Sequence, residues 1–345
     1  MSRIATPEYR RCPVTGRWVI LAPERALRPI QLQHADPHPR RDAAGKGLCP
    51  FCPGNEVMVP SEVYAVRDPG TEADRPGWQL RVVPNKFPAV KELSDSSPMA
   101  ITPDGFSEAM IGFGRHEVVV ETERHDSDPV SLSDDEFTRL LVAYRERLKE
   151  LAKNPRFTFA SVFKNVGAEA GASLAHLHSQ IIALPLVPDA IRTELEAGND
   201  YYRRERRCAY CDMIRYETES ALRVVDDGQQ FLTVCPFAPR FAYETWVLPK
   251  THDSRYETAT DADLLVLARQ MKRLLTAMDA VLSGPAYNWY LHCGPLRAAN
   301  MPYYHWHIEI APKTARPAGF EWGSGCFINA VPPELAAVKL RAALK

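Results

Sequence analysis

The sequence has no excess of charge of either sign and no long apolar run. Its 345 residues include 42 lysines and arginines against 43 aspartates and glutamates, so no long-range field points to nucleic acid or an anionic membrane as a partner. No segment approaches the roughly 18 apolar residues of a membrane span. The first residues, MSRIATPEYRRCPVTG, lack the apolar stretch of a secretion signal. We therefore expect a cytoplasmic protein whose anionic ligands are held by local groups.

The sequence also lacks the cysteine pattern of a disulfide framework. Four of its eight cysteines form two Cys-x2-Cys pairs, Cys49 with Cys52 and Cys208 with Cys211. In a cytoplasmic chain such pairs indicate metal binding rather than disulfides. The other four are scattered, as is typical of buried small apolar residues, and we assign no role to Cys12, Cys235, Cys293 and Cys326.

The order of features in the first half of the chain returns in the second half, which predicts an internal repeat. Each half contains a Cys pair, a strand-like segment broken by proline, a strand that leads to a histidine in the tripeptide HDS, an amphipathic helix and a His-x-His strand. The helices are predicted over 134–153 and 261–282, where apolar residues recur at spacings of three and four.

The chain length fits two units of roughly 150 residues each. Because the repeat divides the chain in the same way, we expect two domains, 1–190 and 191–345. The segment 185–207 is polar and partly helical in pattern, as expected of a connector. The first half is longer where Pro, Gly, Asp and Ser cluster, which indicates loop insertions.

Two cysteines and two histidines from separated stretches form the ligand set of a closed tetrahedral zinc site. The repeat supplies this set twice. The predicted ligands are Cys49, Cys52, His125 and His176 in the first half, and Cys208, Cys211, His252 and His305 in the second. One Cys pair alone would also fit two ordinary cysteines in a turn, but the repeated order favours metal. We expect two zinc ions per chain, with iron as an alternative in the second site.

The His-x-His strand of the first half suggests chemistry. Side chains alternate along a strand, so His176, His178 and Gln180 share one face. His176 can then hold metal while His178 points at a ligand, with Gln180 beside it as a neutral hydrogen-bond donor. An isolated His-x-His more often contains a hydrogen-bonded core histidine, but the adjacent glycine loop favours catalysis. In the second half Glu309 replaces Gln180, and because a carboxylate would repel phosphate, that pair is predicted to be structural.

The segment KNVGAEAGAS (164–173) places Gly167 and Gly171 where the backbone can approach a phosphate, with Ser173 as a further donor. A neutral imidazole, with an ordinary pKa of about 6.5, can attack phosphorus directly. The expected intermediate is a phosphoramidate on His178. Arg25 and Arg28 are able to clamp phosphate oxygens, although solvated surface arginines are the alternative interpretation.

These motifs together resemble the galactose-1-phosphate uridylyltransferase family, a branch of the histidine triad superfamily, from about residue 8 to 340. The matching segments are RRCPVTGRWVILAPERALRP, CPFC, VVPNKFPA, RHDSD, KNVGAEAGAS with HLHSQ, and YYHWHIEI. The resemblance implies an α+β fold of two tandem histidine-triad-like halves, each an antiparallel sheet with a helix. It also implies a homodimer whose sugar site is completed by the partner subunit.

The resemblance further implies ping-pong transfer of a uridylyl group from UDP-glucose to galactose 1-phosphate or a similar hexose 1-phosphate. The family's nucleophile falls on His178 and its helper on Gln180, and the first-half metal ligands also match. The family positions that contact the nucleotide, its phosphates or the nucleotide sugar fall on Arg25, Arg28, Asn85, Asn165 and Ser173.

The chain departs from the family pattern at two places, and the second of them concerns the substrate. Leu177 replaces the usual proline between the two histidines, and the C-terminal stretch 319–337 lacks the Tyr-Glu pairing that recognises the hexose. That stretch resembles the plant ADP-glucose phosphorylase branch, which moves AMP and accepts inorganic phosphate. We expect a hexose-1-phosphate uridylyltransferase, with ADP-glucose phosphorylase as the alternative. A non-catalytic, zinc-stabilised nucleotide-binding protein is the alternative of another class, and the difference between HLHSQ and HWHIE argues against it.

Overall fold

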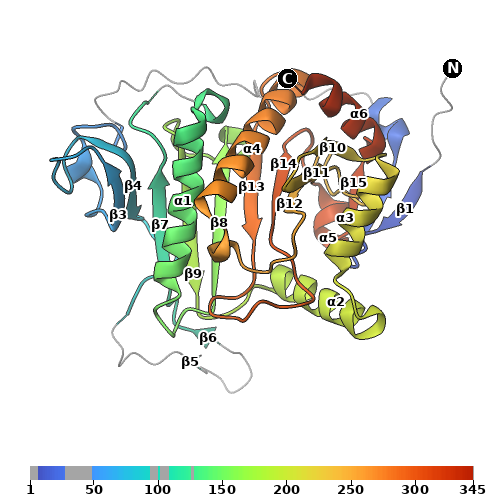
Figure 1. Cartoon of the computed structure of the whole chain (residues 1–345), viewed down its shortest axis with the longest axis horizontal. Coiled ribbons are helices and arrows are strands. Elements are labelled where there is room, and N and C mark those ends of the chain that lie inside the picture. The colour runs from blue at the N-terminus through green and yellow to red at the C-terminus, as the bar shows by residue number, and fades with distance from the viewer. Residues whose placement is uncertain (1–6, 28–48, 94–99, 102–108, 126–127, 345) are drawn as a thin grey trace.

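The computed structural model describes residues 7–27, 49–93, 100–101, 109–125 and 128–344, and its centre is one large antiparallel sheet (Figure 1). Every neighbouring pair of strands in this sheet is antiparallel. In spatial order its ten strands are β10 (Val224–Asp227), β11 (Phe231–Val234), β12 (Thr245–Pro249), β14 (His307–Pro312), β13 (Tyr287–His292), β8 (Phe159–Val166), β9 (His178–Leu184), β7 (Arg115–Val120), β4 (Trp78–Pro84) and β3 (Tyr64–Arg67). The expectation of an α+β fold is confirmed.

The sheet is continuous between the two halves of the chain. The strands β3, β4, β7, β8 and β9 come from the first half, and β10 to β14 come from the second. The halves meet where β8 pairs with β13, from Val166 opposite Tyr287 to Val162 opposite Leu291. The predicted division into 1–190 and 191–345 thus corresponds to two parts of one sheet.

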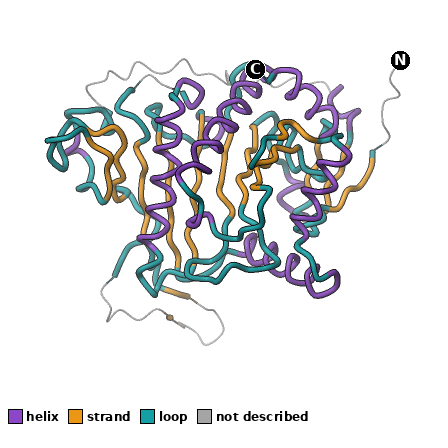
Figure 2. The backbone as a smooth tube through the Cα atoms, viewed as in Figure 1, coloured by secondary structure: helices purple, strands orange, loops and turns teal. Residues whose placement is uncertain are grey.

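Two long helices run across one face of the sheet (Figure 2). They are α1 (Asp134–Leu151) and α4 (Asp261–Leu282), and both predicted helices are confirmed. Each begins with a capping box, in which the N-cap side chain accepts from the third helical N–H and that residue's side chain accepts in return. Ser133 and Glu136 form the first box, and Thr260 and Asp263 form the second. The buried faces of both helices pack into the main core.

Alternation along the strands gives the first half of the sheet two different faces. Val119 and Ile181 belong to the core beneath α1 and α4. Val118, one residue earlier, packs with the first Cys pair and Phe51 on the opposite face. The residues of β7 and β9 that share this second face include His178, so the chemistry predicted from sequence lies on the side away from the long helices.

Two smaller sheets complete the described strands. A three-stranded sheet joins β1 (Glu8–Arg11), β2 (Trp18–Leu21) and β15 (Phe327–Asn329), and β5 (Ala100–Ile101) pairs with β6 (Ala109–Met110). The remaining helices are α2 (Asp189–Glu205), within the predicted connector, α3 (Ala209–Ser220), α5 (Gly319–Ser324) and α6 (Pro333–Ala343). Arg10 of β1 pairs with Glu334 of α6 at 2.8 Å, which fixes the N-terminal strands to the second half of the chain. Among the helices of the described residues, none is long and apolar enough to cross a membrane.

Candidate active site and metal clusters

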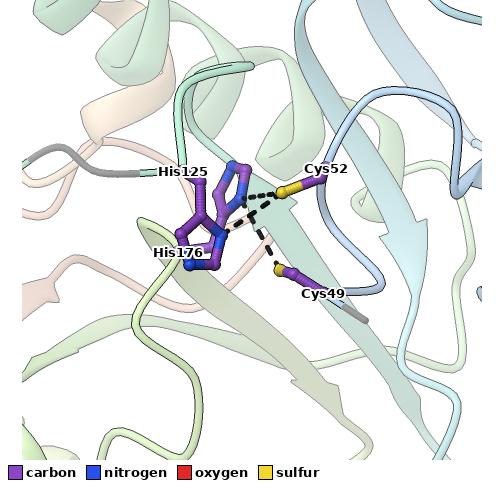
Figure 3. A group of neighbouring side chains, drawn as sticks. All are labelled: Cys49, Cys52, His125 and His176. Carbon is purple, nitrogen blue, oxygen red and sulfur yellow. Dashed lines mark hydrogen bonds between the residues drawn. The ribbon is translucent and has the colours of Figure 1, made fainter. Parts of the chain in front are cut away.

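The first predicted ligand set comes together beside the start of β9. Cys49, Cys52, His125 and His176 converge from separate segments (Figure 3), and their ligand atoms all lie within 4.8 Å of one another. The Nδ1 atom of His125 lies 3.2 Å from Cys52 Sγ. The Nδ1 atom of His176 lies 3.7 Å from Cys52 Sγ and 3.8 Å from Cys49 Sγ.

The second predicted set forms an equivalent cluster. Cys208 is the N-cap residue of α3, and Cys211 lies in the first turn of that helix. Together with His252 and His305 they place their ligand atoms within 4.8 Å of one another. Cys211 Sγ lies 3.3 Å from His252 Nδ1 and 3.7 Å from His305 Nδ1. A hydrogen bond from Cys211 holds the pKa of the Cys208 thiol far below its usual value, so the pair offers a thiolate.

Backbone carbonyls orient His176 of the first cluster and both histidines of the second. The Nε2–H of His176 donates to Thr122 O at 2.7 Å, and that of His305 donates to Pro249 O at 2.7 Å. His252 Nε2 donates to Met301 O at 3.1 Å. Because a carbonyl only accepts, each Nδ1 keeps its lone pair and points it into the cluster.

The distances in both clusters fit a tetrahedral metal. Zinc binds thiolate sulfur at about 2.3 Å and imidazole nitrogen at about 2.0 Å, which separates the two ligand atoms by about 3.5 Å in a tetrahedron. The sulfur–nitrogen distances above, from 3.2 to 3.8 Å, bracket that value. Each donor set is complete with four protein ligands, as in a structural site.

His178, the first residue of β9, lies next to the first cluster and outside it. Its Nδ1 lies 2.8 Å from His176 O, so Nδ1 carries the proton and Nε2 keeps the lone pair. The Phe51 ring packs 5.3 Å from the imidazole, centroid to centroid. Burial lowers the pKa of His178 below its ordinary value, so the ring is neutral at pH 7. The side chain therefore offers an oriented, uncharged nitrogen nucleophile.

Gln180 lies on the same face and is held by a residue that the sequence analysis did not single out. The Nε2 atom of His116, in β7, lies 2.7 Å from Gln180 Oε1. Asn85 follows β4, and its backbone N–H donates to His116 O at 2.8 Å. His116, Val118 and Val120 alternate along β7, so the period-two pattern would have placed His116 on the site face.

A buried ion pair supports the backbone of His178 from the opposite face. Lys164 Nζ lies 2.5 Å from Glu121 Oε2 and 3.4 Å from His178 O. Both side chains are almost completely buried. Removing one partner of such a pair leaves an uncompensated charge in the core, which typically costs about 3–5 kcal/mol. The pair thus ties Lys164 of β8 to Glu121, which follows β7, and to the first residue of β9.

The glycine loop is a tight turn between β8 and β9. Gly167 and Gly171 have φ angles of 81° and 89°, which L side chains rarely adopt. A Cβ on Gly167 would also lie 2.9 Å from Ala286 Cβ. The N–H of Gly171 donates to Ala168 O at 2.9 Å, so this group stabilises the turn itself. A contact of the loop with phosphate stays a prediction.

The other predicted substrate-binding groups around this loop have different surroundings. Asn165 Oδ1 accepts from Asn288 Nδ2 at 2.8 Å, and the same amide of β13 donates to Ala170 O. The second half of the chain therefore supports the loop of the first. Ser173 is exposed after the turn, and Asn85 is half-buried.

In the second half, aromatic side chains fill the space around His307 that corresponds to the surroundings of His178 in the first half. Val118 pairs with Gln180, whereas in the second half Trp246 pairs with Glu309. The Trp246 ring lies 5.2 Å and the Tyr210 ring 5.1 Å from the His307 ring. His307 has no exposed surface, against 9% for His178. An occluded imidazole has no access to a substrate, in agreement with the structural role expected for this pair.

The negative charge of Glu309 is balanced by a cation of the protein. Arg240 pairs with Glu309, hydrogen-bonds Tyr290 and lies 3.5 Å from Glu244 Oε1. Although burial raises the pKa of Glu309, the Arg240 guanidinium more than offsets this and holds it well below its ordinary value. The Arg240 guanidinium thus pairs with the carboxylate of Glu309, which stands where the first half has Gln180.

The sequence analysis did not identify a third group of possible metal ligands. Glu194, His292 and His307 bring possible ligand atoms within 4.8 Å of one another. The Nδ1 of His292 lies 2.8 Å from Glu194 Oε2, which pairs these two groups directly. Glu194 comes from the connector helix α2, so only the tertiary structure places it beside β13.

Of the two arginines predicted to clamp phosphate, the structure describes only Arg25. Arg25 is exposed in a short 3-10 helix, Pro23–Leu27, that follows β2. The N-terminal strands lie beside α3 and α6, at the opposite end of the large sheet from β7 and β9 (Figure 1). Arg28 lies outside the described residues.

Sequence comparisons find relatives with named enzyme activities, and the matches cover nearly the whole chain. A family model described as galactose-1-phosphate uridyl transferase, N-terminal domain, matches residues 1–188, and a domain of unknown function, DUF4921, matches 108–345. ADP-glucose phosphorylase of Arabidopsis thaliana is 36% identical over 97% of this chain and 93% of its own length. Galactose-1-phosphate uridylyltransferase of Thermotoga maritima is 28% identical over 97% and 98%.

Solved structures agree with these matches. The crystal structure of an ADP-glucose phosphorylase from Arabidopsis thaliana with bound ADP-glucose superposes with a TM-score of 0.83 at 33% identity, covering 97% of this chain and 99% of that one. A structure described as uridylyltransferase superposes with a TM-score of 0.75 at 29% identity, covering 98% of both chains. Both similarities extend across the two halves.

Proposed function

Because the chain belongs to the galactose-1-phosphate uridyl transferase family, whose curated relatives are nucleotidyltransferase-type enzymes, we propose that it transfers a nucleoside monophosphate through a covalent intermediate on His178. The observation that carries the proposal is the hydrogen bond from His178 Nδ1 to His176 O, which leaves the Nε2 lone pair as the nucleophile. The contrast with the occluded His307 supports assigning this chemistry to the first half alone.

In the first half-reaction, His178 Nε2 attacks the α-phosphorus of a nucleoside diphosphate sugar. The N–P bond forms as the bond from that phosphorus to the bridging oxygen breaks, and the sugar 1-phosphate leaves. The Nδ1 proton stays on the ring, where His176 O stabilises the positive charge that develops. In the second half-reaction a phosphate oxygen of the acceptor attacks the same phosphorus, and the neutral imidazole is released.

The metal clusters have a positioning role in this proposal. Cys49, Cys52, His125 and His176 would hold one zinc ion, and the second cluster would hold another zinc or an iron ion. A closed four-ligand site supplies structural rigidity and no reactive coordination position. His176 O, which accepts from the nucleophile, belongs to a residue whose ring would be bound to metal, so the cluster sets the position of His178.

We propose an adenosine diphosphate sugar as the preferred donor, because the ADP-glucose phosphorylase relative has the higher identity, 36% against 28%. A uridine diphosphate sugar is the second candidate, on the strength of the full-length Thermotoga maritima relative. The acceptor would be inorganic phosphate or a hexose 1-phosphate.

A donor screen tests the substrate. Protein incubated with ADP-, UDP- and GDP-glucose, each labelled in the base, should be nucleotidylated fastest by ADP-glucose. Chasing the labelled protein with inorganic phosphate should then release ADP, and galactose 1-phosphate serves as the competing acceptor. Faster labelling by UDP-glucose, with UDP-galactose formed in the chase, would identify a uridylyltransferase instead.

We also propose that the active site is completed by a second copy of the chain. Arg25 follows the N-terminal strands, which lie at the opposite end of the large sheet from β9 (Figure 1), so a phosphate clamp built from it needs the partner subunit of a dimer. Arg28 is proposed for the same clamp.

Mixing two inactive variants tests this arrangement. His178→Ala and Arg25→Ala should each have little activity, but hybrids formed by co-expression contain one intact site. We expect about a quarter of the wild-type activity, from random pairing of subunits. Mixing His178→Ala with Gln180→Ala is the matched control, because both changes fall in the same half and no intact site results. Equal activity in the two mixtures would contradict a shared site.

A further inference from the structure

We infer that His116 is a positioning residue: its Nε2–H holds the Gln180 amide oxygen, which turns the Gln180 NH2 group toward the phosphate oxygens in front of His178. This inference rests on the proposed function, because it assigns Gln180 a substrate phosphate as partner. It concerns a residue of β7 that does not itself touch the reacting atoms.

The protonation of His116 follows from its neighbours. The backbone N–H of Ala89 donates to His116 Nδ1 at 3.1 Å. A backbone N–H is always a donor, so Nδ1 must be the unprotonated nitrogen and the proton of the neutral ring resides on Nε2. Burial lowers the pKa of His116, in agreement with a neutral ring. A doubly protonated ring would place two donors against each other at Ala89.

The orientation of the Gln180 amide follows in turn. His116 Nε2, now a donor, lies 2.7 Å from the Gln180 side chain and needs an acceptor there, which only Oε1 supplies. Asn85 Nδ2 lies 3.2 Å from the same ring nitrogen. The Phe87 N–H donates to Asn85 Oδ1 at 2.8 Å, so the Asn85 amide presents its NH2 group to the ring and offers it no acceptor.

The Gln180 NH2 group is left to serve a ligand. Within the part of the chain that the structure describes, no acceptor bonds to it. Gln180 follows His178 by two residues on one strand, so both side chains stand on one face. A neutral amide rotated by 180° would present its oxygen to the phosphate and repel it. The hydrogen bond from His116 lowers the energy of the orientation in which the NH2 group faces the phosphate.

The second half shows what happens when this pair is replaced. The register of β12 with β14 places Trp246 opposite Glu309, as Val118 is opposite Gln180, so Glu244 occupies the position equivalent to His116. Both acidic residues contact Arg240, a protein cation. The His–Gln pair is therefore confined to the half whose histidine keeps some exposed surface.

A double-mutant cycle tests the inference. His116→Phe keeps an aromatic ring without nitrogen, and His116→Gln keeps an N–H near the place of Nε2. We expect His116→Phe to slow single-turnover labelling of His178 about 10- to 100-fold, as for the residues that orient metal ligands through a hydrogen bond, with KM changed less than about twofold. His116→Gln should recover part of the rate. In a Gln180→Ala background, His116→Phe should slow labelling no further.

The outcomes separate the two claims. If the wild-type protein is labelled by no nucleotide sugar, the proposed function fails and the role of His116 fails with it. If the wild type is labelled but His116→Phe matches its rate, only the positioning role is overturned. The same holds if His116→Phe slows labelling by the same factor in the Gln180→Ala background.

Nitrogen NMR of the His116 imidazole gives a readout independent of turnover. Protonated Nε2 is expected, and protonated Nδ1 in the folded protein would overturn the proposed orientation of Gln180. Thermal unfolding identifies a variant that fails to fold.

Discussion

His178→Ala should abolish covalent labelling by any nucleotide sugar and lower the overall transfer rate at least about 10⁴-fold, because the attacking nitrogen is lost. The variant should keep its fold. His178 is not among the clustered ligands, and its ring makes a single described side-chain hydrogen bond, to His176 O. The measurement is the stoichiometry of acid-labile, base-stable label on the protein, together with the unfolding temperature.

The equivalent residue of the second half is the matched control. His307→Ala should retain the label on His178, but it removes a fully buried ring packed between Tyr210 and Trp246. We expect a loss of several kcal/mol from the cavity, in the range of large-to-small changes in cores. Label that survives His178→Ala at wild-type stoichiometry would show that another residue is the nucleophile.

Loss of one cysteine ligand should destabilise the fold strongly. Structural zinc sites in small peptides contribute on the order of 10 kcal/mol. We expect Cys49→Ala to lose one metal equivalent and to lower the unfolding temperature by roughly 10 °C or more, the shift for a loss of about 5 kcal/mol. Cys208→Ala should behave in the same way. Metal content by elemental analysis and thermal unfolding provide the measurement.

Cys326→Ala is the control for this prediction, because Cys326 is a partly exposed thiol outside both clusters. The Cys326→Ala variant should keep its metal and its stability.

A chelator should inactivate the wild-type protein only as fast as the fold opens, since the clusters are closed by four ligands. Immediate inhibition of a fully folded protein would mean that the metal has an open position and takes part in the chemistry.

The sequence predicted the elements that depend on local chemistry. The capping residues Ser133 and Thr260 precede helices because their side chains accept from otherwise unpaired N–H groups. The two ligand sets were recognised because metal coordination restricts residue type and leaves a repeated order of Cys and His. The structure brings both sets together, although the identity of the bound metal stays a prediction.

Contacts between distant segments escaped the sequence analysis. The pairing of β8 with β13 has no signature in either strand, because backbone hydrogen bonds do not depend on side-chain type. The same limit applies to Glu194 beside His292, and to the separation of the N-terminal strands from β9. Glu309 was expected to repel phosphate, but its pairing with Arg240 was not predicted, because Arg240 approaches from a separate loop.

The pairing of β8 with β13 makes the two halves inseparable. A truncated chain ending near residue 188 would leave β8 as an open edge, with a row of unsatisfied amide and carbonyl groups that promotes aggregation. Such a fragment would also lose Asn288, which anchors the turn at Ala170. The half whose histidine has no exposed surface is thus an obligatory scaffold, and any minimal version of this protein must supply a substitute for the neighbouring strand β13.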